Sequence, residues 1–321
     1  MKISEKELIY VSSQIGFRPE MLEKVWHLMT ILDGINAHPF LHDKVALKGG
    51  TALNLFYFAL PRLSVDIDLN YIGNQDKEEM LQERPLVEKA LEAIFLREGM
   101  SIRRVPSKHA GGKWQLKYEQ ALGGNGNLEV DINFMFRIPL CGIVKKHSHP
   151  IGERQTGEVS LLDIHEVGAG KLAALFDRHA SRDLFDAHEL LTKERLDLEK
   201  FRTLCLLYGA ISGTDWRTIS PEKIHFDKSE LQQQLIPVLR KSIAKNNIDW
   251  SSWTTQLLSH TKQSLQQFFP LRENEIEFLN KLLDEGIIKS ELLTSDSKLQ
   301  DPLKRFPPLL WKAKLAKSTG L

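Results

Sequence analysis

Acidic and apolar residues alternate strictly over a short segment, from Val65 to Leu69. Period two is the signature of a β-strand, so we expect Asp66 and Asp68 on one face and the apolar residues on the other. Two such carboxylates repel by about 1 kcal/mol at about 4 Å in water, and by roughly 4 kcal/mol at an effective dielectric constant of about 20. A divalent cation reverses the sign of this interaction. Mg²⁺ is the candidate, because it takes hard oxygen ligands and substrate phosphates.

A second strand with the same alternation is predicted from Leu128 to Phe136, with Glu129 and Asp131 on its polar face. If it lies beside the first strand, a third carboxylate joins Asp66 and Asp68. Three carboxylates from two neighbouring strands are what a two-magnesium nucleotidyl transfer site requires. The alternative is an exposed strand face, where alternating polar residues are normal.

The turn Gly49-Gly50-Thr51 lies between an apolar run, Val45 to Lys48, and a helix predicted from Ala52 to Leu60. Glycines let a backbone approach a ligand closely, and the start of a helix offers free N–H groups and a positive dipole end to phosphate. The Thr51 hydroxyl adds a donor. A Gly-Gly pair before a helix is usually only a turn, but a phosphate-binding element joined to a metal-binding strand favours metal-assisted chemistry on a nucleotide.

The elements that position these residues are predicted from hydrophobic periodicity and turn residues. One helix is expected to open at Pro19 and to end by Pro39. Another is expected from Asp76 to Gly99, with a break near Glu83 because Pro85 interrupts it. Strands are expected over Ser101–Val105, Lys113–Glu119 and Val159–Leu162, and a basic loop over Pro106–Gly112.

Two further helices carry charged residues at helical spacing. Asp163 is expected to cap a helix that contains Lys171 and Arg178, and a second helix is expected to begin at Ser181 and to hold Asp183 and Asp186. For Arg178, Arg182 and Asp186, an Arg–Asp network that fixes the two helices is one reading. From residue 196 onward the pattern is helical, with helices predicted over Asp197–Tyr208, Ser229–Ile243, Ser252–Phe269 and Arg272–Asp284.

Tryptophans and basic residues of the C-terminal part allow two interpretations. Trp216, Trp250, Trp253 and Trp311 are most simply explained as packing residues, with base stacking the alternative. The basic segment from residue 302 to 321 could bind RNA phosphates or form a solvated terminal helix.

Composition sets the class of protein. The 321 residues include 43 Lys and Arg against 42 Asp and Glu, so the net charge gives no global nucleic-acid signal. Two cysteines argue against a disulfide scaffold and fit a reducing compartment. Charges are scattered through the first 16 residues, which argues against a signal peptide, and no run is long enough to span a membrane. We therefore expect a cytoplasmic protein without a membrane partner.

Three segments, GGTAL, RLSVDIDL and KLAALFDRHASRDLFDA, together resemble the AbiEii/AbiGii toxin family over residues 41–195. Those proteins are nucleotidyltransferase-fold toxins of bacterial toxin–antitoxin and abortive-infection systems. The first superfamily motif is usually Gly-Ser, and Gly50-Thr51 stands in its place here. The resemblance implies an α+β fold: a polymerase-beta-like nucleotidyltransferase core, in which helices flank a mixed sheet, and a C-terminal helical bundle. We expect an N-terminal helical segment at 1–40, the core at 41–165 and a helical C-terminal domain at 166–321.

The resemblance also implies the chemistry. It implies magnesium-dependent transfer of a nucleoside monophosphate from an NTP to tRNA or another RNA, which would block translation or growth. A protein acceptor, and an NTP-binding regulatory protein with little catalysis, are the alternatives. A cognate antitoxin encoded nearby is an expected partner.

The residues expected to act are carried over position by position. Asp131 matches the acidic position of the third superfamily motif and is chosen over Glu129. The metal ligands are then Asp66, Asp68 and Asp131, which are catalytic together with Lys171. The expected nucleotide-binding residues are Lys48, Gly49, Gly50, Thr51, Arg62, Ser64, Lys171 and Asp183.

Overall fold

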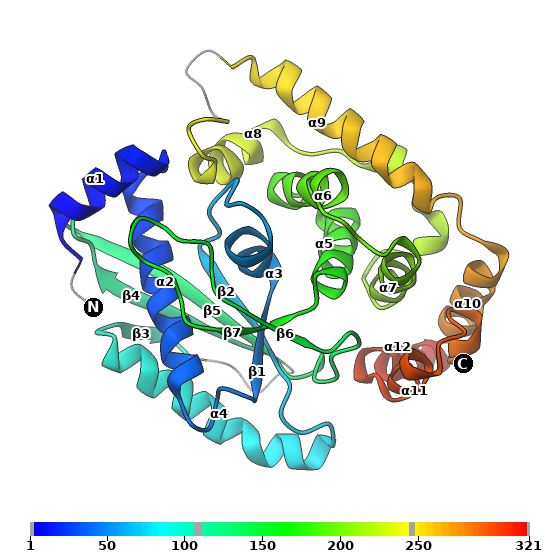
Figure 1. The fold of residues 1–321 in the computed structure, drawn as a ribbon. Helices are drawn as coiled ribbons and strands as arrows, with labels where there is room; N and C mark the ends of the chain where they lie inside the picture. Colours follow the sequence, from blue (N-terminus) through cyan, green and yellow to red (C-terminus); the bar gives the residue numbers. More distant parts are fainter. Residues whose placement is uncertain (1–2, 106–110, 244–247, 320–321) are drawn as a thin grey trace. The chain divides into compact units, whose positions relative to one another are not determined.

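The computed structural model describes residues 3–105, 111–243 and 248–319 (Figure 1). The chain divides into two compact units. Unit 1 comprises Met1–Pro139, Ile143–Leu162 and Ile236–Asn246, and unit 2 comprises Leu140–Gly142, Asp163–Leu235 and Asn247–Leu321. None of the helices formed by the described residues has the length and apolar character needed to cross a membrane.

Unit 1 is built on a seven-stranded sheet with the strand order β3-β4-β5-β2-β1-β7-β6. The strands are β1 Val45–Lys48, β2 Asp66–Tyr71, β3 Ser101–Arg104, β4 Gly111–Glu119, β5 Asn125–Asn133, β6 Ile143–Lys146 and β7 Val159–Leu162. β2 runs parallel to β5 and β1 runs parallel to β7, while the other neighbours are antiparallel. The mixed sheet of the predicted α+β fold is therefore present.

The helices of unit 1 pack beside this sheet (Figure 1). They are α1 Glu5–Ile15, α2 Pro19–Ala37, α3 Gly49–Ala52 with the π-helical turn Leu53–Tyr57, and α4 Lys77–Arg97, and a short 3-10 turn follows at Ile236–Val238. α2 begins with Pro19 at its first turn, as predicted. α2 packs against α4 and β5, and α4 packs against β3.

The prediction that Pro85 breaks its helix is wrong, because α4 runs through it. An internal proline costs about 3 kcal/mol. The helix continues because Met80 before the proline and Val87 and Leu91 after it are all buried. Ion pairs also brace the same stretch, with 2.8 Å between Lys44 Nζ and Glu83 Oε1. The basic loop predicted at 106–112 lies mostly outside the described residues.

Unit 2 is helical, which agrees with the predicted C-terminal bundle. Its longer helices are α5 Ile164–Arg178, α6 Ser181–Lys193, α7 Leu198–Ala210, α9 Trp250–Leu265, α10 Glu273–Leu283, α11 Ser297–Arg305 and α12 Pro307–Thr319. Asp163 caps α5 by accepting a hydrogen bond from the His165 N–H, as predicted. The single helix predicted over Ser229–Ile243 is wrong. The chain there forms the short turns Lys228–Glu230, Leu231–Leu235 and Ile236–Val238, because Pro237 lacks a donor and disfavours helix at the residue before it.

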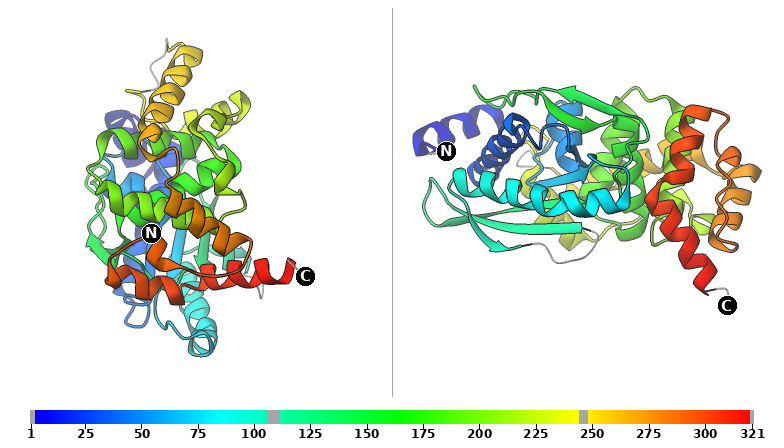
Figure 2. Two further views of the ribbon diagram at one scale, coloured as in Figure 1. Left: turned by 90° about the vertical axis from the view of Figure 1, so that its right-hand side faces the viewer. Right: turned by 90° about the horizontal axis from the view of Figure 1, so that it is seen from below.

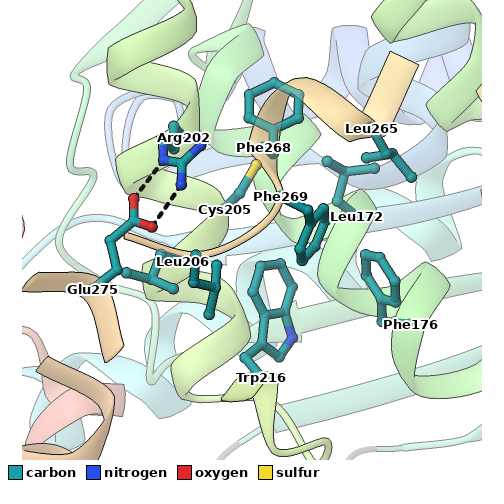
Figure 3. Close-up of a pocket in the computed structure, with 11 residues that line it drawn as sticks. Leu172, Phe176, Arg202, Cys205, Leu206, Trp216, Leu265, Phe268, Phe269 and Glu275 are labelled. Carbon is teal, nitrogen blue, oxygen red and sulfur yellow. Dashed lines mark hydrogen bonds and ion pairs between the residues drawn. The ribbon is translucent and has the colours of Figure 1, made fainter. Parts of the chain in front are cut away.

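Aromatic and aliphatic side chains of α5, α7 and the segment after α9 enclose a small cavity in unit 2 (Figure 3). Trp216 lies at this cavity and is buried, so the packing role predicted for it is confirmed. Arg202 at the rim donates to both carboxylate oxygens of Glu275, at 2.5 and 2.7 Å. The packing role predicted for Trp311 is wrong, because 60% of this side chain is exposed.

Candidate active site

The two acidic strands lie side by side in unit 1. β2 and β5 pair in parallel, with Asp66 opposite Glu129 and Asp68 opposite Asp131. Register partners in neighbouring strands project from the same face of a sheet. The pairing hypothesised from the sequence is therefore present, and a third carboxylate lies beside the first two.

The environment of Asp131 disfavours its charge. Burial raises the pKa of this carboxyl above its ordinary value, and the neighbouring Asp68 charge raises it further. Lys48 and Lys113 oppose this shift. When two like charges are partly withdrawn from water, a bound cation gains more electrostatic free energy than it would at an exposed pair.

The donor set fits magnesium, since all three side chains offer hard oxygen atoms from adjacent strand positions. Within the described ranges no group of three or more His, Cys, Asp or Glu side chains already converges closely enough to hold an ion. An aspartate side chain can rotate around two bonds, χ1 and χ2. These carboxylates could therefore converge on a metal ion by rotation, without movement of the strands.

Gly49, the first residue of the glycine turn, lies against the strand that carries Asp66 and Asp68. Its φ of +74° lies in the left-handed region that favours glycine. A Cβ atom added at this position would collide with the Asp68 carboxylate. β1 and β2 bring the two together, because Lys48 is the register partner of Asp68. Any larger residue at position 49 would therefore displace a predicted metal ligand.

Thr51 ties the glycine turn to β2. Its buried hydroxyl donates to the backbone carbonyl of Asp66 at 2.5 Å. The Asn54 side-chain amide donates to the Gly50 carbonyl at 3.0 Å. The helix that starts at Gly49 then widens into the π-helical turn and leaves helical geometry at Phe58, so the predicted helical end at Leu60 is wrong. These bonds fix the turn against the strand that carries the aspartates.

Lys113 is a site residue that the sequence did not reveal. It is the register partner of Asp131 in the β4–β5 pair, and its Nζ lies 2.6 Å from Glu129 Oε2. The hydrogen bond to Glu129 raises the pKa of Lys113, and the charges of Asp66 and Asp131 add to the effect. The sequence predicted only a strand over Lys113–Glu119, and the register of the hairpin places this lysine among the carboxylates.

Glu129 and Asp131 differ in their partners. Glu129 is held by Lys113 and accepts a hydrogen bond from Gln115 at 3.2 Å, and the Lys113 bond is the main reason that its pKa is lowered. Asp131 lies opposite Asp68 instead. This difference favours Asp131 as the metal ligand, which stays a prediction.

The two residues predicted just before the aspartates differ in exposure. The guanidinium of Arg62 is almost fully buried in unit 1 and donates to the Leu63 carbonyl at 2.8 Å. The backbones of Arg62 and Leu239 form an isolated β-bridge. Ser64 is half-buried. Nucleotide contact by either residue stays a prediction.

Lys171 and Asp183 meet within unit 2. The Lys171 ammonium lies 2.7 Å from Asp183 and 3.0 Å from Asp186, and all three side chains are buried. Burial alone would raise the pKa of Asp183, but the charges of Lys171 and Arg178 hold it well below its ordinary value. Arg178 Nε donates to Asp183 at 2.5 Å. An Arg–Asp contact therefore joins α5 to α6, but through Asp183, while the Asp186 of the predicted network meets Lys171; these contacts fix the position of the Lys171 charge.

Known proteins resemble this chain over most of its length. A family model described as the nucleotidyl transferase AbiEii toxin of type IV toxin–antitoxin systems matches residues 30–280. The solved structure of the nucleotidyltransferase toxin MenT4 (Rv2826c) from Mycobacterium tuberculosis H37Rv is similar, with a TM-score of 0.59 and 15% sequence identity. The similarity covers 96% of this chain and 99% of that chain, and at this identity it shows a shared fold. No curated protein matches the sequence.

Proposed function

The chain belongs to the AbiEii family of nucleotidyl transferase toxins, and on that premise we propose that it transfers a nucleoside monophosphate from an NTP to an RNA acceptor. The observation that carries this proposal is the parallel pairing of β2 with β5, which sets Asp68 beside Asp131. Side-by-side carboxylates of this kind suit magnesium-dependent phosphoryl chemistry. A protein that only binds a partner has no use for them.

The proposed step is an in-line displacement at the α-phosphorus of the NTP. The acceptor hydroxyl oxygen forms a bond to phosphorus, and the bond from phosphorus to the bridging oxygen of pyrophosphate breaks. Pyrophosphate leaves with the electron pair. The hydroxyl proton passes to a base, and Asp131 is the candidate because its carboxylate lies beside Asp68 at the proposed metal site.

Asp66, Asp68 and Asp131 are the residues that would hold magnesium. When bound, the ion would neutralise triphosphate charge and favour ionisation of the attacking hydroxyl. The chain itself supplies the positions of the oxygen donors through the register of β2 and β5.

The NTP phosphates are assigned to the other predicted residues. Gly49, Gly50 and Thr51 would offer backbone N–H groups at the start of α3, and Lys48 would supply positive charge. We add Lys113 to this set, because its ammonium already interacts with the carboxylates of the site. Arg62 and Ser64 are assigned to shaping the pocket.

Lys171 is assigned to the triphosphate, where a compact ammonium suits a concentrated negative charge. Asp183 would act as its positioning residue, since the buried ion pair limits where the ammonium can go.

The acceptor class is tRNA or another RNA, and its modification would block translation or growth. The substrates, NTP and RNA, assign this activity to the cytoplasm. A type IV system implies an antitoxin, which we propose is encoded nearby.

The test uses the purified protein, magnesium, total cellular RNA and each NTP labelled at either the α- or the γ-phosphate. Label in RNA from the α-labelled NTP alone is the expected result. Label on protein would redirect the assignment to a protein acceptor. NTP binding with no transfer to either acceptor would favour a regulatory binder and contradict the proposal.

A further inference from the structure

The last helix of unit 2 presents an unusual outward side, which we name the α12 surface. It consists of Leu310, Trp311, Lys314, Leu315 and Lys317, all of them exposed. Leu310, Lys314 and Lys317 form one row at i, i+4 and i+7, and Trp311 and Leu315 form the adjacent row. An aromatic ring and two ammonium groups therefore lie next to one another on one helix face.

The helix that carries this surface is firmly docked. Leu309 and Ala313 are buried on its inner side, and α12 packs against α10 and α11 (Figure 2). Lys312 Nζ donates to the Ser212 carbonyl at 2.7 Å. Gly286 lies so close beneath that a Cβ there would collide with the Ala313 carbonyl. The exposure of Trp311 is thus a property of a packed helix.

The segment 302–319 carries charge of one sign, although Asp301 directly before it lies 3.8 Å from Lys304. Residues 302–319 contain five basic residues, Lys304, Arg305, Lys312, Lys314 and Lys317, and no acidic residue. The whole chain is nearly neutral, so this segment is more basic than the chain as a whole. A polyanion is the partner that complements such a surface.

We propose that the α12 surface binds single-stranded RNA, with Trp311 stacking on an unpaired base and Lys314 and Lys317 contacting phosphates. An exposed indole beside ammonium groups is the combination that holds single strands, whose bases are free to stack. The proposal rests on the proposed function and adds to it the surface that holds the acceptor.

The distribution of apolar residues favours RNA over a lipid surface. A helix that lies on a membrane buries a whole apolar face, with polar residues opposite. In α12 the apolar residues lie on both sides, since Leu309 and Ala313 face inward while Leu310, Trp311 and Leu315 face outward. Three outward apolar side chains among lysines suit a base and its phosphates better than an acyl layer.

The test measures binding of a fluorescein-labelled, unstructured 15-nucleotide RNA to the full-length protein by anisotropy, without NTP, between 50 and 200 mM salt. Trp311→Ala is expected to weaken binding by about 5- to 150-fold, the equivalent of losing one stacked base. Tyr10→Ala is the matched control, because Tyr10 is exposed to 66% on unit 1.

Charge is tested with Lys314→Gln/Lys317→Gln. Glutamine keeps the aliphatic stem of Lys317, which lies over Gly286. The slope of log affinity against log salt is expected to fall by about 1.4, at about 0.7 for each phosphate contact on a single strand. The control is Lys77→Gln/Lys89→Gln, which removes the same charge from exposed positions of α4.

Each outcome decides the proposal. Unchanged RNA affinity of Trp311→Ala overturns it, as does equal or tighter binding of a duplex of the same sequence. It is also overturned if Trp311→Ala alters self-association, or binding to phosphatidylserine vesicles, while RNA affinity stays the same. RNA binding without label transfer would instead contradict the proposed function alone. Transfer with an unchanged KM for RNA in Trp311→Ala would contradict the α12 surface alone.

Discussion

Gly49→Ala tests whether glycine is needed at this position to leave room for the Asp68 carboxylate, apart from the backbone strain that any other residue would add. An L-residue held in the left-handed region costs about 1–2 kcal/mol, and Gly49 has a φ of +74°. In addition, the new Cβ would collide with the Asp68 carboxylate, so that carboxylate must move. Misplacement of a reacting group by about 1 Å can cost on the order of 100-fold in rate. We therefore expect modest destabilisation and a drop in kcat/KM of about 100-fold.

Gly99→Ala is the matched control for this prediction. Gly99 has a φ of +76°, and a Cβ added there would meet nothing within 4 Å. Gly99→Ala therefore adds the same backbone strain but displaces no side chain of the candidate active site. Denaturant unfolding should give similar losses of stability for both variants, and transfer of α-labelled NTP to RNA should fall only in Gly49→Ala. Equal kcat/KM for Gly49→Ala and Gly99→Ala would refute the argument that Gly49 makes room for Asp68.

Three further substitutions test the electrostatics. Asp183→Asn should cost about 1.5–3 kcal/mol, because Lys171 and Arg178 both lose this charged partner while Lys171 keeps Asp186. Because the pKa of Asp183 is lowered, the gap to wild type should be complete above the ordinary pKa of 3.8 and should shrink as the pH of the unfolding experiment falls below it. Burial raises the pKa of Glu166 from 4.5 to about 7, so wild type should lose roughly 3 kcal/mol relative to Glu166→Gln as the pH rises from about 4 to 8. An equal change in the free energy of unfolding of wild type and Glu166→Gln between these pH values would contradict the raised pKa of Glu166. Asp131→Asn should raise the melting temperature of the metal-free protein, because it removes a repelled carboxylate, and should abolish stabilisation by Mg²⁺.

The acidic strands could be predicted because their signal is local. Strict alternation identified the segments at Asp66 and Asp131, and the apolar positions of both strands are buried. The proximity of the two strands was a hypothesis that the sequence could pose but not decide, since pairing partners depend on the topology of the whole sheet.

The predictions that failed depended on tertiary context. Pro85 sits inside α4 because buried side chains on both sides of it hold the helix against its neighbours. Lys113 belongs to a predicted strand, but its place among the carboxylates follows from the register of β4 on β5. Trp311 looks like a packing residue by type, and its outward position follows from which face of α12 meets α10 and α11.

The central claim is metal-assisted nucleotidyl transfer at the acidic strands, and Asp68→Ala tests it most directly. Purified wild type, Asp68→Ala and the control Asp43→Ala, whose side chain is 67% exposed, would each be incubated with α-labelled NTPs, magnesium and total RNA. Circular dichroism would establish that all three are folded. Label in a discrete RNA band with wild type and Asp43→Ala, and none with Asp68→Ala, is the predicted result. Undiminished labelling by Asp68→Ala would contradict the account.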